Sequence, residues 1–472
     1  MRELFAGFTV TDVHARLGDE AWRALSRNET TPARRRTEAG DDLDTLIRLF
    51  LLHDPVPASS VRGLTTFVDH GLVRVDGDDA VAEVEVRPYG DDTHDWWVVC
   101  DLTPGFDGQH APMRPDFVLG ISEASTSLAQ LTHRRPVRRV LDLGTGCGVQ
   151  ALHATTHAAE VVATDVNERA LGFTRLAAEL NDVQIGVRAG SFYEPVAGER
   201  FDLITTNPPF VVSPPDGDRL VYRETGFELD GVVQHVVQGA ADHLEPGGWC
   251  QILAAWVQRD GESWEDRLRS WIAPTGLDAW VVRRELAELA DYTEIWLADA
   301  GHRGAADHTE RYDRWLTWFA EHDVEAMNFG WINLRRADRA TPVVRIEHHD
   351  GPVRQPVGPA IVAWGDAVDA LDGRDPLDVA WRVADGVVQE SVGPPGAADP
   401  SVIALRQEFG LCRRRRVDTV TAALVGACDG DLTAGQILDA VGALLDEDPA
   451  ALRATYREVL IDLVEEGFLG LA

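Results

Sequence analysis

Short apolar runs alternate with segments of helical periodicity through the middle of the chain. The runs are rich in Val, Leu and Ile and are short enough for buried strands. The segments between them carry apolar side chains at the spacing of one helix face. Strands that alternate with helices form a parallel sheet covered by helices, so we expect an α/β, Rossmann-like domain over residues 96–345. Its predicted strands are 140–143, 160–164, 201–206, 249–255, 280–283 and 326–334, and its predicted helices are 149–156, 167–180 and 230–243. The insertion 292–319 is expected to form a packed helical pair, with a lid as the alternative.

The two ends of the chain show the pattern of separate, mainly helical units. Residues 1–95 contain three periodic helices followed by a hairpin, an order typical of winged-helix folds, which bind nucleic acid or protein. Residues 346–472 begin with a Gly- and Pro-rich stretch and end in two helices that run into a strand, again winged-helix-like. We therefore expect three domains. The predicted elements are helices at 12–25, 41–52, 59–70, 434–445 and 449–466, a hairpin at 71–86 and a strand at 467–469.

Charge restricts the kinds of chemistry and partner. The formal net charge is −34, and all 44 basic residues are arginine. The lack of lysine excludes Schiff-base chemistry and a phosphate-binding loop of the GK[ST] type. So acidic a surface repels phosphate backbones on average, and nucleic-acid binding would need local arginine clusters. Residues 34–36, expected in a loop, and residues 413–416 are such clusters. Either could contact phosphate, but a solvated loop or arginines that cover acidic neighbours explain them equally well.

Cysteine usage and hydropathy point to a cytoplasmic protein. The five cysteines are scattered and form no Cys-x-x-Cys pair, which argues against a disulfide framework and a zinc ribbon. No run of eighteen apolar residues exists, and the N-terminus lacks the apolar run of a signal peptide. We expect no metal site and no membrane partner.

A glycine-rich turn and an acid follow the first two strands. The strand 140–143 leads into residues 144–148, which hold three glycines, and then into a helix. A strand, a tight glycine turn and a helix N-terminus form a nucleotide cradle, because glycines permit close backbone approach. The second strand ends in Asp165, whose carboxylate could accept both hydroxyls of a ribose, and Asn167 caps the next helix. Together these features predict a nucleotide-type cofactor site.

The tetrapeptide after the strand 201–206 suits methylation of a planar nitrogen. The lone pair of an amide or ring amino nitrogen is delocalised, so the nitrogen is a poor nucleophile. Asn207 and the Pro208 carbonyl could accept its two hydrogens and hold it in line with an incoming methyl group. Pro208 and Pro209 stiffen the loop, and Phe210 offers a flat face. A plain strand-ending turn is the alternative, since Asn-Pro and Pro-Pro are common loop dipeptides.

In this order the motifs resemble a class I S-adenosylmethionine-dependent methyltransferase of seven strands. Residues 207–214, Asn-Pro-Pro-Phe-Val-Val-Ser-Pro, resemble the release-factor glutamine N5-methyltransferases and the small-domain methyltransferases related to them. The resemblance covers residues 96–345, with 118–128 as a loop and helix over the cofactor. It implies catalytic roles for Asn207, Pro208, Pro209 and Phe210, and S-adenosylmethionine contacts from Asp142, Gly144, Thr145, Gly146, Gly148, Asp165, Ser191 and Asn207.

Two positions depart from that family. An acid usually lies near the adenine amino group after the third strand, where this chain has Ser191. The aromatic position is more often Tyr in the glutamine enzymes, whereas Phe, as at Phe210, also occurs in relatives that methylate guanine or adenine.

Three functions remain open from the sequence. The first is methylation of a protein glutamine, with a translation release factor as the implied partner, which the Val-Val-Ser-Pro continuation and the acidity favour. The second is methylation of an exocyclic base amine in RNA or DNA, favoured by Phe210 and the winged-helix-like ends. The third is an inactive binding protein with a methyltransferase fold. The sequence leaves the oligomeric state and the role of the terminal units open.

Overall fold

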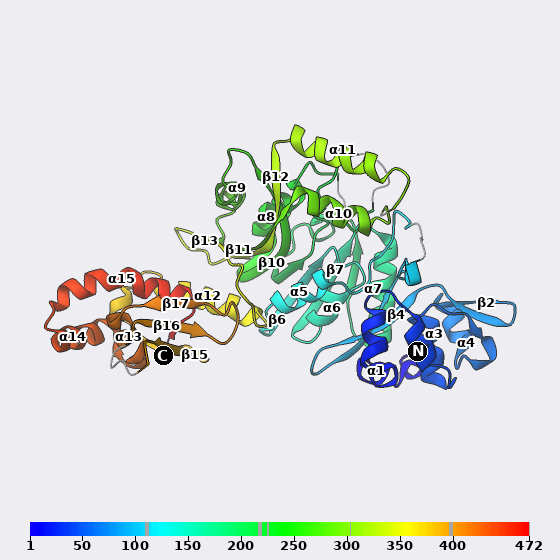
Figure 1. Cartoon of the computed structure of the whole chain (residues 1–472), viewed down its shortest axis with the longest axis horizontal. Coiled ribbons are helices and arrows are strands. Elements are labelled where there is room, and N and C mark those ends of the chain that lie inside the picture. The colour runs from blue at the N-terminus through cyan, green and yellow to red at the C-terminus, as the bar shows by residue number, and fades with distance from the viewer. Residues whose placement is uncertain (109–112, 216–219, 224–225, 303, 396–399, 472) are drawn as a thin grey trace. The chain divides into compact units, whose positions relative to one another are not determined.

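A computed structural model describes residues 1–108, 113–215, 220–223, 226–302, 304–395 and 400–471. Contacts divide the chain into two compact units (Figure 1). The first comprises residues 1–129 and 136–342, and the second comprises residues 130–135 and 343–472. Within the described ranges, every helix is too short or too polar to span a bilayer.

The central sheet of the first unit has the strand order β11-β12-β10-β9-β6-β7-β8. Neighbouring strands from β8 to β10 run parallel, whereas β12 is antiparallel to both β10 and β11. This is the seven-strand order of class I methyltransferases, so the predicted fold class is confirmed. The strands are β6 Val137–Leu143, β7 Ala158–Asp165, β8 Gly186–Ala189, β9 Phe201–Thr206, β10 Leu244–Arg259, β11 Asp278–Glu288 and β12 Val324–Arg335.

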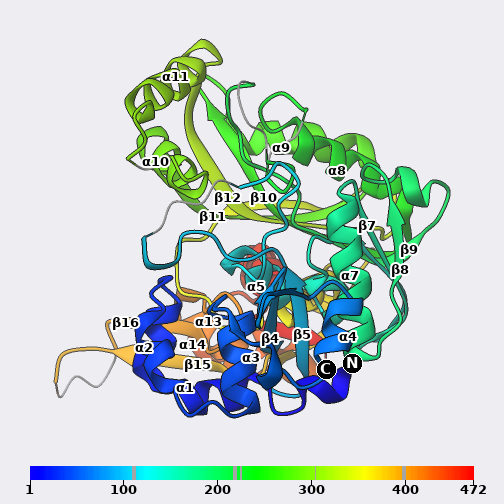
Figure 2. The same ribbon diagram turned by 90° about the vertical axis from the view of Figure 1, so that its right-hand side faces the viewer.

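Helices connect the strands as the apolar periodicity predicts. Asn167 caps α7 as expected, because its side chain accepts a hydrogen bond from the Arg169 N–H at 3.0 Å. The segment between β11 and β12 forms two helices, α10 and α11, that lie beside each other (Figures 1 and 2). The helices are α5 Glu123–Leu131, α6 Val149–Ala154, α7 Glu168–Asn181, α8 Gly231–His243, α9 Trp264–Ile272, α10 Leu289–Asp299 and α11 His308–Glu321.

The N-terminal part is helical, with two corrections to the prediction. Residues 34–36 lie in helix α2 and not in a loop, because Pro32 starts a helical turn there. The helix predicted at 59–70 is shorter, since Gly63 takes a left-handed φ of 74° just before α4 begins. The elements are α1 Val10–Leu25, α2 Thr31–Arg36, α3 Asp42–Phe50, β1 Val56–Pro57, α4 Leu64–Asp69, β2 Val73–Asp76, β3 Asp79–Ala82, β4 Glu85–Gly90 and β5 Asp95–Cys100.

One apolar core joins this N-terminal part to the Rossmann-like part. Phe5 and Phe8 belong to the same buried cluster as Phe173 and Leu180 of α7. Trp97 fixes the junction, because its indole N–H donates to the Phe8 carbonyl at 2.7 Å. Contacts thus place both parts in one unit, and an independently folding domain at residues 1–95 stays a prediction.

The second unit contains two small antiparallel sheets and a helical end. The helices α14 and α15 lie where the sequence predicts them, and a capping box between Thr433 and Gln436 starts α14. A winged-helix identity for this end stays a prediction. The elements are β13 Val344–His348, α12 Gly358–Leu371, β14 Ala380–Val383, β15 Val387–Val392, β16 Val402–Gln407, β17 Arg414–Val417, α13 Thr419–Gly426, β18 Asp429–Thr433, α14 Ala434–Leu445, α15 Pro449–Glu465 and β19 Leu469–Leu471.

Both arginine clusters make ion pairs within their own units. Arg34 bonds to Asp54 and Asp107, with nitrogen–oxygen distances of 2.8 and 2.9 Å. In the second unit, Arg413, Arg414 and Arg415 bond to Glu347, Glu390, Asp462 and Glu466. These contacts favour the interpretation that the arginines cover acidic neighbours.

Candidate active site

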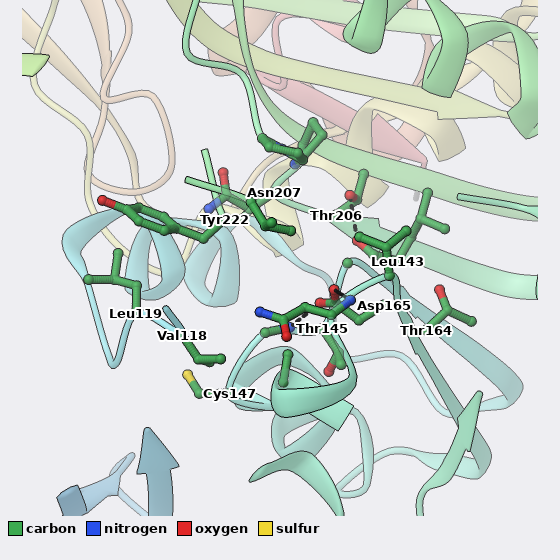
Figure 3. A pocket seen from close by; sticks show the side chains of 18 of the residues that line it. Val118, Leu119, Leu143, Thr145, Cys147, Thr164, Asp165, Thr206, Asn207 and Tyr222 are labelled. Atoms are coloured by element: carbon green, nitrogen blue, oxygen red, sulfur yellow. Dashed lines mark hydrogen bonds between the residues drawn. The ribbon is translucent and has the colours of Figure 1, made fainter. Parts of the chain in front are cut away.

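A cavity of about 460 Å³ lies at the carboxyl ends of β6, β7 and β9 (Figure 3). Ligands of open α/β sheets bind at this edge, because the loops after the strands converge there. The cavity brings together the glycine turn, Asp165, Ser191 and the loop that starts at Asn207, which are far apart in the sequence. Among the described residues, no group of three or more His, Cys, Asp or Glu side chains is placed to hold a metal ion.

The turn after β6 has the backbone that only glycine adopts readily. Gly144, Gly146 and Gly148 have φ values of 77°, 55° and 84°. The N–H groups of Gly144 and Thr145 both donate to the Thr164 carbonyl at 2.9 Å, which ties the turn to β7. A Cβ atom at Gly144 or Gly146 would meet nothing within 4 Å, so the turn borders open space. A ligand can therefore approach the backbone closely.

Asp142 holds this turn in shape from below. Its side chain is only 1% exposed, and Oδ2 accepts hydrogen bonds from the Thr145 hydroxyl at 2.6 Å and the Ala151 N–H at 3.0 Å. Burial raises the pKa of Asp142 to about 7. The structure thus places Asp142 beneath the turn, where it fixes Thr145 and the start of α6, and any direct cofactor contact from it stays a prediction.

Asp142→Asn is expected to remove a pH-dependent part of the stability. The pKa of Asp142 is higher in the folded protein than its usual 3.8, so this carboxyl stabilises the fold fully below about pH 4 and loses that contribution as the pH rises through about 7. Relative to the Asn variant, the parent should lose at most about 4 kcal/mol of unfolding free energy over that range. Urea unfolding at a series of pH values measures this, and parallel curves for the two proteins would contradict it.

Asp165 is oriented by the backbone around it. One carboxylate oxygen accepts from the Gly146 N–H and the other from the Asn167 N–H, both at 2.9 Å. Burial raises the pKa of Asp165. A carboxylate has about four acceptor sites, so two backbone bonds leave capacity for two hydroxyl groups. The adjacent Val166 is 55% exposed and lines the same cavity, which offers an apolar surface to a base.

The loop after β9 presents an acceptor atom that has no partner in the part of the chain that the structure describes. Thr206 fixes the strand end, because its hydroxyl donates to the Leu143 carbonyl at 2.7 Å. The next residue, Asn207, has a buried Oδ1 with no hydrogen-bond partner among the described residues. An unsatisfied buried acceptor costs about 1–3 kcal/mol, so the fold maintains this oxygen at a cost. Pro208 and Pro209 line the cavity beside it.

The Phe210 ring lies outside the cavity that Asn207, Pro208 and Pro209 line. Its ring is edge-on to Trp296 of α10 and Phe329 of β12, with centroids 6.4 and 6.3 Å apart. Phe210 is not among the described residues that line the cavity. The ring therefore anchors the loop to an apolar cluster that includes Tyr292 of α10 and Phe319 of α11. Its stacking role stays a prediction.

The segment that forms most of the cavity matches a known protein family. Residues 120–261, which contain the glycine turn, Asp165 and the Asn207 loop, match the family model described as "Methyltransferase small domain". These residues form a methyltransferase small domain. A separate model, a domain of unknown function (DUF7059), matches residues 5–84.

The methyltransferase small domain carries the similarity to curated proteins. The chain is 36% identical over 146 residues to the release factor glutamine methyltransferase of Xylella fastidiosa, which covers 28% of this chain and 52% of that protein. It is 34% identical over 135 residues to the ribosomal RNA small subunit methyltransferase C of Pasteurella multocida, 28% of this chain and 37% of that one. The chain spans about half the length of the first of these relatives. Among solved structures, the T. thermophilus 16S rRNA N2 G1207 methyltransferase in complex with AdoMet and guanosine matches 44% of this chain and 55% of that chain, with 20% identity and a TM-score of 0.28.

The sequence motifs did not indicate every residue that lines the cavity. Ser191 lines the cavity as expected, beside Phe192, whose φ of 44° is left-handed. Tyr222 and Phe227 also line it, from the part of the chain between β9 and α8. That segment has no apolar periodicity, so no sequence signal indicated its contribution. The segment predicted as a loop and helix over the cofactor, 118–128, also lines the cavity through Val118, Leu119, Gly120 and Ser122, whereas Phe117 just ahead of it was not predicted.

Proposed function

We propose that this chain is an S-adenosylmethionine-dependent N-methyltransferase that acts on a planar amide or amino nitrogen. The most favoured acceptor is a protein glutamine side chain, with a translation release factor as the first candidate. One observation supports this above the others. The unpartnered Oδ1 of Asn207 borders the same cavity as the glycine turn and Asp165. The group proposed to hold the acceptor and the groups proposed to hold the cofactor then border one cavity.

The residues present fit the cofactor. Asp165 has acceptor capacity for the two ribose hydroxyls, and the open backbone of Gly144 and Gly146 leaves room for the methionine part. Val166 and Phe192 offer apolar faces to the adenine. When bound, S-adenosylmethionine supplies a methyl group on a positively charged sulfur. Asp142 also borders the cavity and positions the turn, because it accepts hydrogen bonds from the Thr145 hydroxyl and the Ala151 N–H.

The Asn207 loop would hold the acceptor nitrogen. The Asn207 Oδ1 and the Pro208 carbonyl can each accept one hydrogen of the NH2 group, which places the nitrogen with its lone pair toward the methyl group. Charge that develops on the nitrogen is stabilised by these two oxygens, because they are fixed before the reaction. The nitrogen would gain the methyl group as the carbon–sulfur bond of the sulfonium breaks, neutral S-adenosylhomocysteine would leave, and one N–H proton would pass to water. Proline at 208 and 209 keeps the loop from relaxing away.

Charge favours a protein acceptor over a nucleic acid. None of the described residues that line the cavity is basic, and the formal net charge of −34 disfavours phosphate contacts. The glutamine methyltransferase of Xylella fastidiosa is the relative with the higher identity of the two compared above. The base amine of an RNA is the second candidate, because the Pasteurella multocida relative is a ribosomal RNA methyltransferase by name. An inactive binding protein is disfavoured, since Asp165 and Asn207 both line the one cavity.

Transfer of labelled methyl groups tests this function. Purified protein and tritiated S-adenosylmethionine are incubated with a cell extract, and the label is divided into protease-sensitive and nuclease-sensitive fractions. The expected result is label in protein, with none above background when Asn207→Ala replaces the parent. Label in RNA or DNA would favour the base-amine alternative. No transfer to either fraction would overturn the proposed function.

A further inference from the structure

A planar acceptor needs a flat apolar partner, a role that the sequence suggests for Phe210. Its ring packs against Trp296 and Phe329 and not into the cavity. Among the residues that the structure describes, four aromatic side chains line the cavity, namely Phe117, Phe192, Tyr222 and Phe227. Of these, Phe192 and Phe227 contact each other, with centroids 5.7 Å apart, and Phe192 directly follows Ser191 after β8, on the cofactor side.

Tyr222 is the aromatic residue best placed to face an acceptor. It borders the cavity together with Asn207 (Figure 3). Its ring is edge-on to Phe117, with centroids 6.0 Å apart, and the neighbouring Val221 N–H donates to the Pro115 carbonyl at 3.0 Å. These contacts hold one side of the residue. The phenol end is held separately, because its hydroxyl donates to Asp299 Oδ2 at 2.7 Å.

Asp299 is the last residue of α10 and receives a second bond from the same segment. Arg223 Nη1 donates to Asp299 Oδ2 and to the Trp296 carbonyl, both at 3.0 Å, and its side chain is only 6% exposed. The Arg223 carbonyl in turn accepts from the Val211 N–H at 2.9 Å, within the loop that starts at Asn207. One carboxylate thus fixes the orientation of Tyr222 and the spacing between Tyr222 and the acceptor loop.

Tyr292 strengthens the same arrangement. It lies on α10, is fully buried, and its hydroxyl accepts from the Val212 N–H at 2.8 Å. Helix α10 therefore bonds to two segments that continue from residues lining the cavity. It bonds to residue 212, beyond Pro209, through Tyr292, and to residues 222 and 223 through Asp299. Helices inserted between β11 and β12 would then control acceptor binding without touching the cofactor turn.

We propose that Tyr222 supplies the flat face for the planar acceptor and determines acceptor specificity, and that Asp299 is the residue that positions it. This inference rests on the proposed function. It moves the role that the sequence suggested for Phe210 to a residue outside the motif, and it gives the α10–α11 insertion a function. An acceptor side chain enters between the Tyr222 ring and the loop of Asn207 and Pro208.

Initial-rate kinetics on Tyr222→Ala, Tyr222→Phe and Asp299→Ala test the proposal. The acceptor is the fraction that takes up label from the parent protein, and cofactor affinity is measured in parallel by calorimetry. Tyr222→Ala should raise the KM for the acceptor about 10-fold, because ring contacts of this kind contribute about a tenfold change in affinity. Tyr222→Phe keeps the ring and should recover most of that loss. The dissociation constant for S-adenosylmethionine should stay within about twofold in all three.

Hydrogen exchange tests the positioning role without any acceptor. Asp299→Ala should accelerate exchange of the Val211 and Val221 amides, whereas Asp291→Asn, an exposed acid on the same helix, should leave them unchanged. Asp299→Asn keeps an acceptor for the Tyr222 hydroxyl. Its exchange rates at the Val211 and Val221 amides should therefore lie between those of Asp299→Ala and Asp291→Asn.

The outcomes separate this inference from the proposed function. If the parent protein labels no macromolecule, the proposed function fails and the inference fails with it. If the parent labels an acceptor but Tyr222→Ala leaves its KM unchanged, only the role of Tyr222 is overturned. Unchanged exchange in Asp299→Ala would overturn the positioning role alone.

Discussion

Asn207→Ala is expected to slow methyl transfer about 100- to 1,000-fold, the usual cost of one lost preorganised contact at a reacting centre. The buried Oδ1 has no partner among the described residues, so its removal breaks no bond that holds the fold. Affinity for S-adenosylmethionine should therefore change little, and thermal stability should not decrease. Single-turnover transfer beside calorimetry for the same protein gives both quantities.

Asn207→Asp serves as the matched variant for this prediction. It keeps an acceptor oxygen and the size of the side chain but adds a negative charge beside the reacting groups. We expect it to transfer methyl groups nearly as slowly as Asn207→Ala. Near-parent rates in the Ala variant would mean that the loop after β9 is only a strand-ending turn.

Asp165→Ala is expected to weaken S-adenosylmethionine binding by about 1–3 kcal/mol, which corresponds to roughly 5- to 150-fold in dissociation constant. Two ribose hydroxyls would lose a charged acceptor, and the N–H groups of Gly146 and Asn167 would lose theirs as well. Calorimetry measures the loss. Melting temperatures of the unliganded parent and Asp165→Ala show how much of the lost affinity comes from loosening of the glycine turn, which the substitution leaves without this acceptor.

Glu160→Ala is the control for Asp165→Ala. Glu160 lies on the same strand but is exposed and pairs with Arg139 at the surface, away from the cavity. The Glu160→Ala substitution should leave the affinity for S-adenosylmethionine unchanged. Equal affinities for the parent and Asp165→Ala would remove Asp165 from the cofactor site.

The fold was predictable because its signals are local. Apolar runs of four to six residues marked β6, β7 and β9, and β9 has the predicted bounds, Phe201–Thr206. The prediction for β10 was too short, at 249–255 against Leu244–Arg259. Its last residues, Gln258 and Arg259, are polar and extend the strand because they pair with β12, which no local pattern shows.

Candidate site residues could be predicted from the sequence where each belongs to a short motif at the end of a strand. The glycine turn, Asp165 and Asn207 each follow a strand, and parallel strands bring their carboxyl ends to one edge. Tyr222 and Asp299 could not be predicted, because an irregular segment and an inserted helix meet only in the folded chain. The direction of the Phe210 ring was equally hidden, since Trp296 and Phe329, which it packs against, are far away in the sequence.

Transfer of a deuterated methyl group, followed by mass spectrometry of the product, is the most direct measurement of the central claim. The protein is incubated with trideuteromethyl S-adenosylmethionine and its acceptor, and tandem spectra locate the added group. Our account predicts the label on a planar nitrogen, first of all the side-chain nitrogen of a protein glutamine, and its loss in Asn207→Ala. A label on oxygen, sulfur or carbon, or equal labelling by Asn207→Ala, would contradict it.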